Sequence, residues 1–232
     1  MSYQAVLFLI AMVAVLLYLN RRDRAHIKAS RAAFYDACLP LFKGYQVTQD
    51  GLYFPVLTGT YAGYAIQLEA IVDHIVIRKI PSLWLLVTVK AEVPYAGILD
   101  FLVRPQNVEF YSPSAKLETR LPIPDTWPQQ AWLRTDRAGA IPPLEVVWRH
   151  MDYFDDTKAK ELVISPRGVR LVYQARQSVR AHYMVLRQVH FDDLVLQPEL
   201  VRELLDRAVA LYEDLRSTAE GVEHRDAENL TG

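Results

Sequence analysis

Two short acidic segments are the first places where this sequence could hold a metal ion. Asp152, Asp155 and Asp156 lie in the sequence DYFDD, and His190 and Asp192 lie in HFDD. Carboxylates combined with a histidine can bind a hard or borderline metal ion, so a metal-dependent hydrolase would result if the two segments met in space. The competing interpretation is structural, because carboxylates at a helix end or just before a helix are typical of turns and caps. The structural interpretation is favoured.

Arginine is concentrated along one predicted hairpin and the strand that follows it. A guanidinium group binds phosphate through two parallel hydrogen bonds, so a strand face of arginines could bind an anionic ligand or a lipid headgroup. The alternative is a solvated sheet face, or a sheet edge that charge protects from pairing. The candidate ligand-binding residues are Arg167, Arg170, Arg176, Arg180 and Arg187.

Composition excludes several other classes of function. The chain has 232 residues and a net charge of −1, and it carries no RNA-binding signature, so nucleic acid is not an expected partner. The single cysteine, Cys38, rules out an internal disulfide and a cysteine-based zinc site, and we expect it to be a small apolar residue on a helix. The segment GTYAGY lacks the Gly-Lys-Ser/Thr of a phosphate loop. No catalytic residue and no cofactor are predicted.

The N-terminal segment predicts membrane attachment. No polar side chain occurs from Ala5 to Leu17, and Tyr3 and Tyr18 flank this run as interfacial aromatic residues do. As a helix, the stretch from Tyr3 to Leu19 spans roughly 25 Å at about 1.5 Å per residue, at the short end of what crosses a hydrocarbon core of about 30 Å. A core helix would keep a polar stripe, and a cleaved signal peptide would have a basic start and a cleavage site. We therefore expect residues 1–20 to be a transmembrane anchor.

Charge on either side of this segment predicts its orientation. Arg21, Arg22 and Arg24 follow the apolar run, whereas no basic side chain precedes it. Basic residues near the end of a span stay in the cytoplasm. The expected topology is a single-pass protein whose N-terminus is outside and whose C-terminal domain is cytoplasmic. Tyr3, Tyr18 and the three arginines would lie at the membrane interface.

The first half of the remaining chain reads as a helix followed by strands. Residues 21–43 lack glycine and are expected to continue the membrane helix as a juxtamembrane helix. Residues 44–104 are expected to form a β-rich unit with two hairpins, one at Asp50-Gly51 with Leu52 to Phe54 as its second strand and one at Ala62-Gly63. The apolar run from Leu83 to Val89 predicts a central strand.

The second half repeats this order after a proline-rich connection. Residues 105–142 hold six prolines and are expected to be irregular, with short strands near 108–111 and 131–134. Residues 143–216 should form a second α+β unit, and residues 217–232 a disordered tail. The expected elements of the second unit are a helix at 144–154, a hairpin at 161–175, a strand at 182–189 and a final helix from Gln197 onward.

The predicted fold class is α+β, with an N-terminal transmembrane helix and antiparallel sheet covered by helices. The two units could be related subdomains, or the strands could form one continuous sheet covered on one face. The favoured function is a membrane-anchored, non-enzymatic scaffold or an accessory or assembly subunit of a membrane complex. Its expected partners are the lipid bilayer and another membrane protein. The anionic-ligand site and the metal-dependent hydrolase are the two alternatives.

Overall fold

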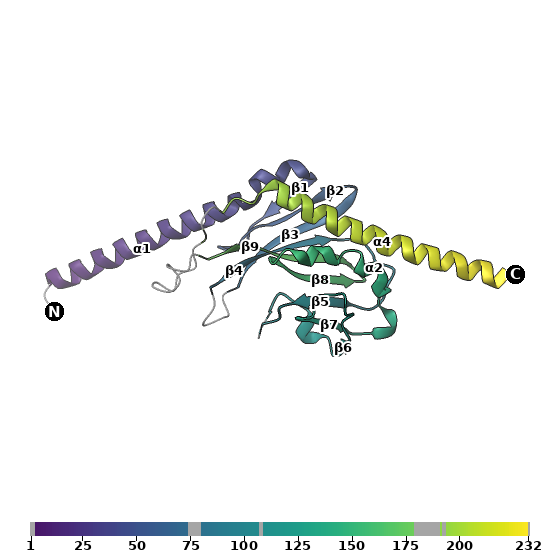
Figure 1. Cartoon of the computed structure of the whole chain (residues 1–232). Coiled ribbons are helices and arrows are strands. Elements are labelled where there is room, and N and C mark those ends of the chain that lie inside the picture. Colours follow the sequence, from purple (N-terminus) through teal and green to yellow (C-terminus); the bar gives the residue numbers. More distant parts are fainter. Residues whose placement is uncertain (1–2, 74–79, 107–108, 179–190, 192–193, 232) are drawn as a thin grey trace.

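Nine strands form one continuous antiparallel sheet in the computed structural model of this chain (Figure 1). The structure describes residues 3–73, 80–106, 109–178, 191 and 194–231. Within these residues the strand order is β1-β2-β3-β4-β9-β8-β5-β7-β6, and every neighbouring pair is antiparallel. The α+β class with an antiparallel sheet is therefore confirmed, and the strands of both halves share one sheet.

The first four strands form a meander at one side of the sheet. The turn between β2 and β3 has positive φ at Ala62 and Gly63, as the predicted hairpin requires. The expected strand from Leu52 to Phe54 is absent, because residues 50–53 form a turn and Phe54 packs on Phe34 at a ring distance of 4.9 Å. The strands are β1 (Lys43–Thr48), β2 (Val56–Tyr61), β3 (Tyr64–Val72) and β4 (Ser82–Val89).

The other five strands complete the sheet through the pairing of β4 with β9. This pairing aligns Val89 with Val169 and Ser82 with Gln177, so it joins the two halves of the chain along a full strand length. Two predictions are confirmed, the strand near 131–134 and the hairpin at 161–175. The predicted strand near 108–111 is wrong, because residues 109–111 form a turn. The expected strand at 182–189 lies outside the described residues. The strands are β5 (Leu99–Val103), β6 (Thr119–Leu121), β7 (Ala131–Thr135), β8 (Ala159–Ser165) and β9 (Gly168–Gln177).

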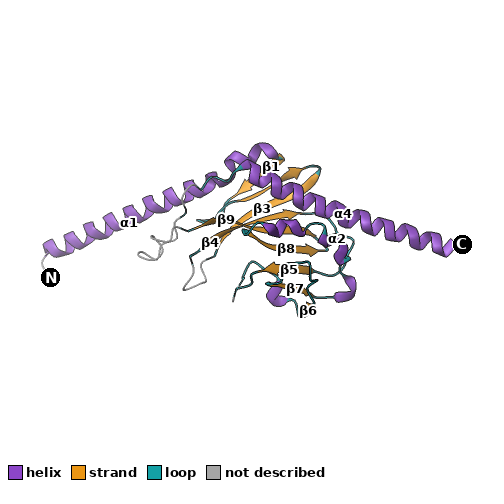
Figure 2. Cartoon of the chain, in the orientation of Figure 1, coloured by secondary structure: helices purple, strands orange, loops and turns teal. Residues whose placement is uncertain are grey.

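Two long helices project beyond the sheet at opposite ends of the molecule, and the C-terminal one first crosses a face of the sheet (Figure 2). The predicted helix at 144–154 is divided into a short α-helix and a 3-10 turn, and the last helix continues well past residue 217, where a disordered tail was expected. The α-helices are α1 (Tyr3–Ala32), α2 (Leu144–Trp148) and α4 (Pro198–Thr231). The 3-10 helices are η1 (Ala33–Leu41), η2 (Ser114–Lys116), η3 (Ala138–Ala140) and η4 (Met151–Asp155).

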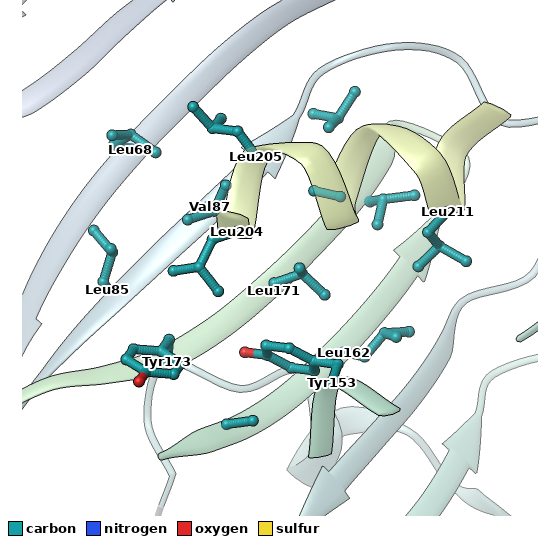
Figure 3. Packing of buried hydrophobic residues seen from close by; sticks show 14 of the residues in the cluster. Leu68, Leu85, Val87, Tyr153, Leu162, Leu171, Tyr173, Leu204, Leu205 and Leu211 are labelled. Atoms are coloured by element: carbon teal, nitrogen blue, oxygen red, sulfur yellow. The ribbon is translucent and has the colours of Figure 1, made fainter. Parts of the chain in front are cut away.

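The main core lies between α4 and one face of the sheet (Figure 3). Leucines recur on one side of α4, including Leu204, Leu205 and Leu211, and they are at most 2% exposed. They cover Leu85 of β4 and Leu171 of β9, which point from the sheet toward the helix. This apolar layer holds α4 against one face of the sheet. Cys38 is buried in the same core, as expected.

Candidate functional site

The sheet face opposite α4 is covered by residues 105–118, which we call the strap; residues 107–108 of the strap lie outside the described part. Trp84 and Leu86 of β4, together with Val172 of β9, form a small second core on this face. Tyr111 of the strap packs on Trp84 at a ring distance of 5.4 Å. The strap is therefore held against the sheet partly by aromatic packing.

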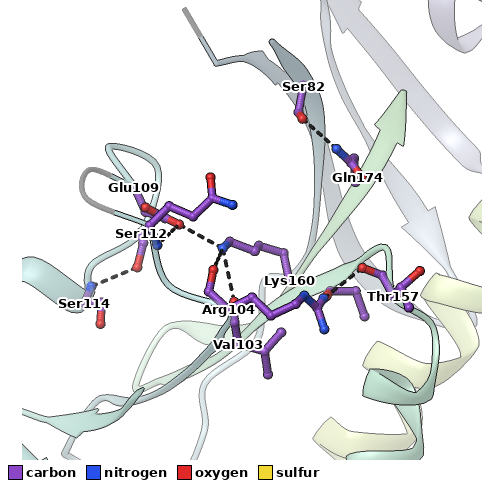
Figure 4. A network of polar contacts seen from close by, with 11 residues as sticks. Ser82, Val103, Arg104, Glu109, Ser112, Ser114, Thr157, Lys160 and Gln174 are labelled. Atoms are coloured by element: carbon purple, nitrogen blue, oxygen red, sulfur yellow. Dashed lines mark hydrogen bonds and ion pairs between the residues drawn. The ribbon is translucent and has the colours of Figure 1, made fainter. Parts of the chain in front are cut away.

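A buried ion pair fastens the strap to the sheet (Figure 4). Lys160 Nζ on β8 lies 2.8 Å from Glu109 Oε1 on the strap, and these side chains are 5% and 7% exposed. The same ammonium group donates to the carbonyl oxygens of Val103 at 3.1 Å and Arg104 at 2.7 Å. Burial lowers the pKa of Lys160, and its hydrogen bond to Glu109 opposes that shift. All three donors of the ammonium group are thus used, which offsets the cost of burying the charge.

Two carboxyl groups are buried side by side beneath the strap. Asp100 on β5 and Glu161 on β8 are both 0% exposed and lie on adjacent strands of the same sheet face. Among the described residues neither carboxyl has a hydrogen-bond partner of good geometry, although Ser114 and Arg134 are close enough to lower the pKa of Asp100. Burial dominates and raises that pKa to about 6. Burial, followed by the charge of Asp100, raises the pKa of Glu161 well above its ordinary value.

This acid pair is suited to holding a proton rather than to catalysis. Burial raises the pKa of both carboxyl groups. They are in this respect similar to the paired carboxyl groups of some enzymes, which share one proton because two like charges cannot lie close together. A substrate cannot reach them in this conformation, because both side chains are shielded from solvent. The pair therefore makes stability depend on pH and offers no reaction site.

A cavity of about 640 Å³ opens beside the strap, at the end where β4 and the β8–β9 hairpin meet. It brings two of the predicted arginines, Arg167 and Arg170, to one place with Lys90, which the sequence had not singled out. Arg170 Nε donates to Thr88 Oγ1 at 3.3 Å, which fixes its guanidinium group at the cavity wall. We call this cavity the basic groove. Its polar lining residues are Thr88, Lys90, Glu92, Ser165, Arg167 and Arg170.

Gly168 sets the shape of the basic groove. Its φ is +142°, and a Cβ at this position would lie 1.9 Å from the carbonyl oxygen of Val89. The hairpin can approach β4 this closely only without a side chain. We expect Gly168→Ala to lower the free energy of unfolding by about 2 kcal/mol, measured by urea denaturation.

Gly139→Ala is the matched control for this substitution. A Cβ at Gly139 meets nothing within 4 Å, and the residue does not have a left-handed backbone. Its free energy of unfolding should stay within about 0.5 kcal/mol of the wild type. Equal stability of the two variants would contradict the close approach described for Gly168.

The remaining predicted arginines are not brought to the groove. Arg176 lies toward the opposite end of β9, past an irregularity in the β4–β9 register, and its Nη2 donates to the carbonyl oxygen of Val195 at 3.4 Å. Arg180 and Arg187 lie outside the described residues. The structure therefore does not bring Arg176 to the same patch as Arg170.

Two of the three predicted metal ligands that the structure describes, Asp152 and Asp156, are hydrogen-bonded to other side chains. Asp152 Oδ2 accepts from Arg207 Nη1 at 2.7 Å, and Asp156 Oδ2 accepts from the Tyr173 hydroxyl at 2.6 Å. Together with Asp155 they line a cavity of about 250 Å³ under α4. No group of three potential ligands that could hold a metal ion occurs within the described residues. His190 and Asp192 fall outside the described part, so their half of the predicted site is not seen.

The predicted interface residues lie on the part of α1 that projects from the domain (Figure 1). Tyr3 and Tyr18 are 79% and 66% exposed, and Arg21, Arg22 and Arg24 are exposed as well. Searched over the residues that the structure describes, no helix has both the length and the apolar character needed to cross a bilayer. The expected transmembrane span is not confirmed.

Sequence reasoning missed the residues of the second sheet face, including Asp100, Glu161, Lys160 and Lys90. One signal was available, since Asp100 and Glu161 each interrupt an apolar strand, in ILDFLV and AKELVIS. A carboxyl group inside such a strand must be buried or lie at an edge. The sequence does not show that the strap covers this sheet face, and that contact is what buries the two carboxyl groups.

Comparison with known proteins gives a likeness of fold to a solved structure. No protein-family model matches the chain, and no curated protein matches it significantly. The fold is similar to the crystal structure of the mycobacterial trehalose monomycolate transport factor A, TtfA, with 11% sequence identity and a TM-score of 0.40. The similarity covers 82% of this chain and 94% of that chain. At this TM-score, the likeness carries no argument about function.

Proposed function

We propose that this chain is a membrane-attached, non-enzymatic accessory subunit that holds its α+β domain at a bilayer to meet a membrane protein. One observation carries the proposal: the large apolar side chains of α1 from Val6 to Leu19 are 39–72% exposed. Each would gain on the order of 2 kcal/mol from leaving water. An apolar surface of this size around a projecting helix must be shielded from water. A lipid bilayer shields a helix on all sides.

The charges that follow the apolar segment support one orientation. Arg31 is committed to the domain, since it donates to the carbonyl oxygen of Leu52 and lies 5.0 Å over the ring of Phe54. Arg21, Arg22 and Arg24 remain exposed between the apolar segment and the domain. Basic residues on the domain side of the apolar segment favour a topology in which the domain is cytoplasmic.

Two exposed features near the end of α1 support a partner beyond the lipid. Tyr53 and Phe110 are 74% and 43% exposed and line a cavity of about 880 Å³ together with Arg31. All six residues of the edge strand β1 are exposed, and within the described sheet β1 pairs only with β2. An open edge of this kind can accept a strand from another protein.

Membrane attachment is tested by changing one valine inside the apolar segment. We expect Val13→Arg to weaken flotation of the full chain with phosphatidylcholine vesicles by roughly 100-fold, because an arginine at the centre of an inserted helix costs about 3 kcal/mol. Val195→Arg makes the same chemical change at a site of similar exposure, 52% against 45%, and should float like the wild type. A wild type that stays with the soluble fraction would refute attachment.

A second experiment separates crossing from shallow insertion. Ser2→Cys introduces a reactive thiol ahead of the apolar segment, whereas Cys38 is 0% exposed and burial raises its pKa to about 11, so it should not react. A membrane-impermeant maleimide added to intact cells labels Ser2→Cys if the helix crosses with its N-terminus outside. No labelling before lysis and full labelling afterwards would indicate insertion from the cytoplasmic side.

A further inference from the structure

We propose that the basic groove is a binding site for a phosphate-type anion carried by a soluble ligand. The first argument is charge. Lys90, Arg167 and Arg170 line the groove with Glu92 as the opposing charge, so the lining carries a net charge of +2 while the whole chain carries −1. Among the described residues, no carboxylate forms an ion pair with any of these three cations.

The second argument is that the guanidinium group of Arg170 is positioned before a ligand arrives. Arg170 is held by its bond to Thr88, and its two terminal nitrogens make no hydrogen bond to the described residues. Arg167 sits on the hairpin turn that Gly168 seats against β4, and its backbone N–H donates to Ser165 Oγ at 3.3 Å. A guanidinium group with free, fixed donors fits a tetrahedral oxyanion bidentately.

The third argument concerns what lies beneath the cations. Glu161 is close enough for the charge of Arg170 to act on it, but burial raises the pKa of Glu161 well above its ordinary value. Burial therefore opposes the charged form of Glu161 that would act as a counter-ion for Arg170. The groove thus keeps its positive charge for a ligand, and its volume of about 640 Å³ is that of a small-molecule site.

Position selects a soluble ligand over a lipid headgroup. The end of α1 lies by Leu52 and Val72, and Val72 pairs with Leu83 at the start of β4. Thr88 lies five residues further along that strand, roughly 17 Å away at about 3.3 Å per residue. If α1 enters a bilayer, the groove lies at the end of β4 that is farther from the membrane. Only this choice of source depends on the membrane attachment proposed above.

The binding experiment uses the full chain in nanodiscs of neutral phosphatidylcholine and inorganic pyrophosphate as the probe. We expect isothermal titration at low ionic strength to show binding that Arg167→Gln with Arg170→Gln weakens more than tenfold. Arg120→Gln with Arg149→Gln removes the same charge from exposed positions outside the groove and should bind like the wild type. Equal weakening in both double variants, or no binding to the wild type, would overturn the proposal.

A second arm distinguishes the source of the phosphate. Hydrogen exchange of residues 88–92 and 165–170 should slow when pyrophosphate is added to neutral nanodiscs, and this protection should be lost in the groove variant. Nanodiscs containing 30% phosphatidic acid, without added pyrophosphate, should give no such protection. Protection by phosphatidic acid alone would assign the groove to lipid headgroups and overturn the soluble source.

Discussion

Replacing Lys160 by methionine should lower the free energy of unfolding by about 3–5 kcal/mol, the largest change expected from a single substitution in this domain. Lys160→Met keeps the length of the side chain but leaves Glu109 charged and buried, and it deprives the carbonyl oxygens of Val103 and Arg104 of a donor. Urea denaturation followed by tryptophan fluorescence measures the loss, because Trp84 lies under the strap.

Two further variants show whether this loss comes from the uncompensated charge. Lys158→Met removes an exposed lysine two residues away and should cost less than about 0.5 kcal/mol. Lys160→Met combined with Glu109→Gln removes both charges and should recover part of the loss. A Lys160→Met protein as stable as Lys158→Met would show that the ion pair does not fasten the strap.

The buried acid pair should make the domain more stable in mild acid than at neutral pH. Asp100 has a pKa of about 6 in the folded chain, above its ordinary value of 3.8, so its contribution is fully present below the ordinary value. Between these two values the unfolded chain ionises first, and stability falls as pH rises. A shift of this size corresponds to about 3 kcal/mol at about 1.4 kcal/mol per pH unit. Glu161, whose pKa is also raised, extends the fall to higher pH.

Asp100→Asn tests this pH dependence because asparagine cannot ionise. We expect the variant to be more stable than the wild type at pH 7 by up to about 3 kcal/mol, and Asp100→Asn with Glu161→Gln to lose most of the slope between pH 4 and pH 7. The free energy of unfolding at unit steps of pH gives the slope. Asp155→Asn changes an exposed carboxyl and should follow the wild type. A wild type whose stability rises across this range would contradict the raised pKa values.

The sequence was sufficient where local rules determine structure. The Ala62-Gly63 hairpin, the central strand from Leu83 and the start of α4 follow from turn chemistry, apolar runs and proline position, and the structure has all three. The predicted strand from Leu52 to Phe54 is wrong. Phe54 is buried by its contact with Phe34, not by pairing within the sheet. Local pattern cannot distinguish a strand residue from a residue buried by a distant helix.

The candidate site depended on contacts that no local rule supplies. Lys90 and Arg170 are far apart in the sequence and meet because β4 pairs with β9. A separation of six residues predicts that Arg176 shares a strand face with Arg170, but the register of β9 against β4 is irregular between the two residues. One extra residue in a strand reverses the side to which all later side chains point.

The joining of β4 to β9 also has a consequence for synthesis of the chain on the ribosome. Val89 pairs with Val169, which lies 80 positions later in the sequence and is therefore synthesised later. Until Val169 and the rest of β9 have been synthesised, β4 is an unpaired apolar edge strand of the incomplete sheet. Such a strand can pair with a strand of a neighbouring chain. If α1 has by then been delivered to the membrane, nascent chains are spaced out along a surface during this interval. We therefore expect that removing the apolar segment would increase aggregation during expression, even though the segment contributes nothing to the packed core.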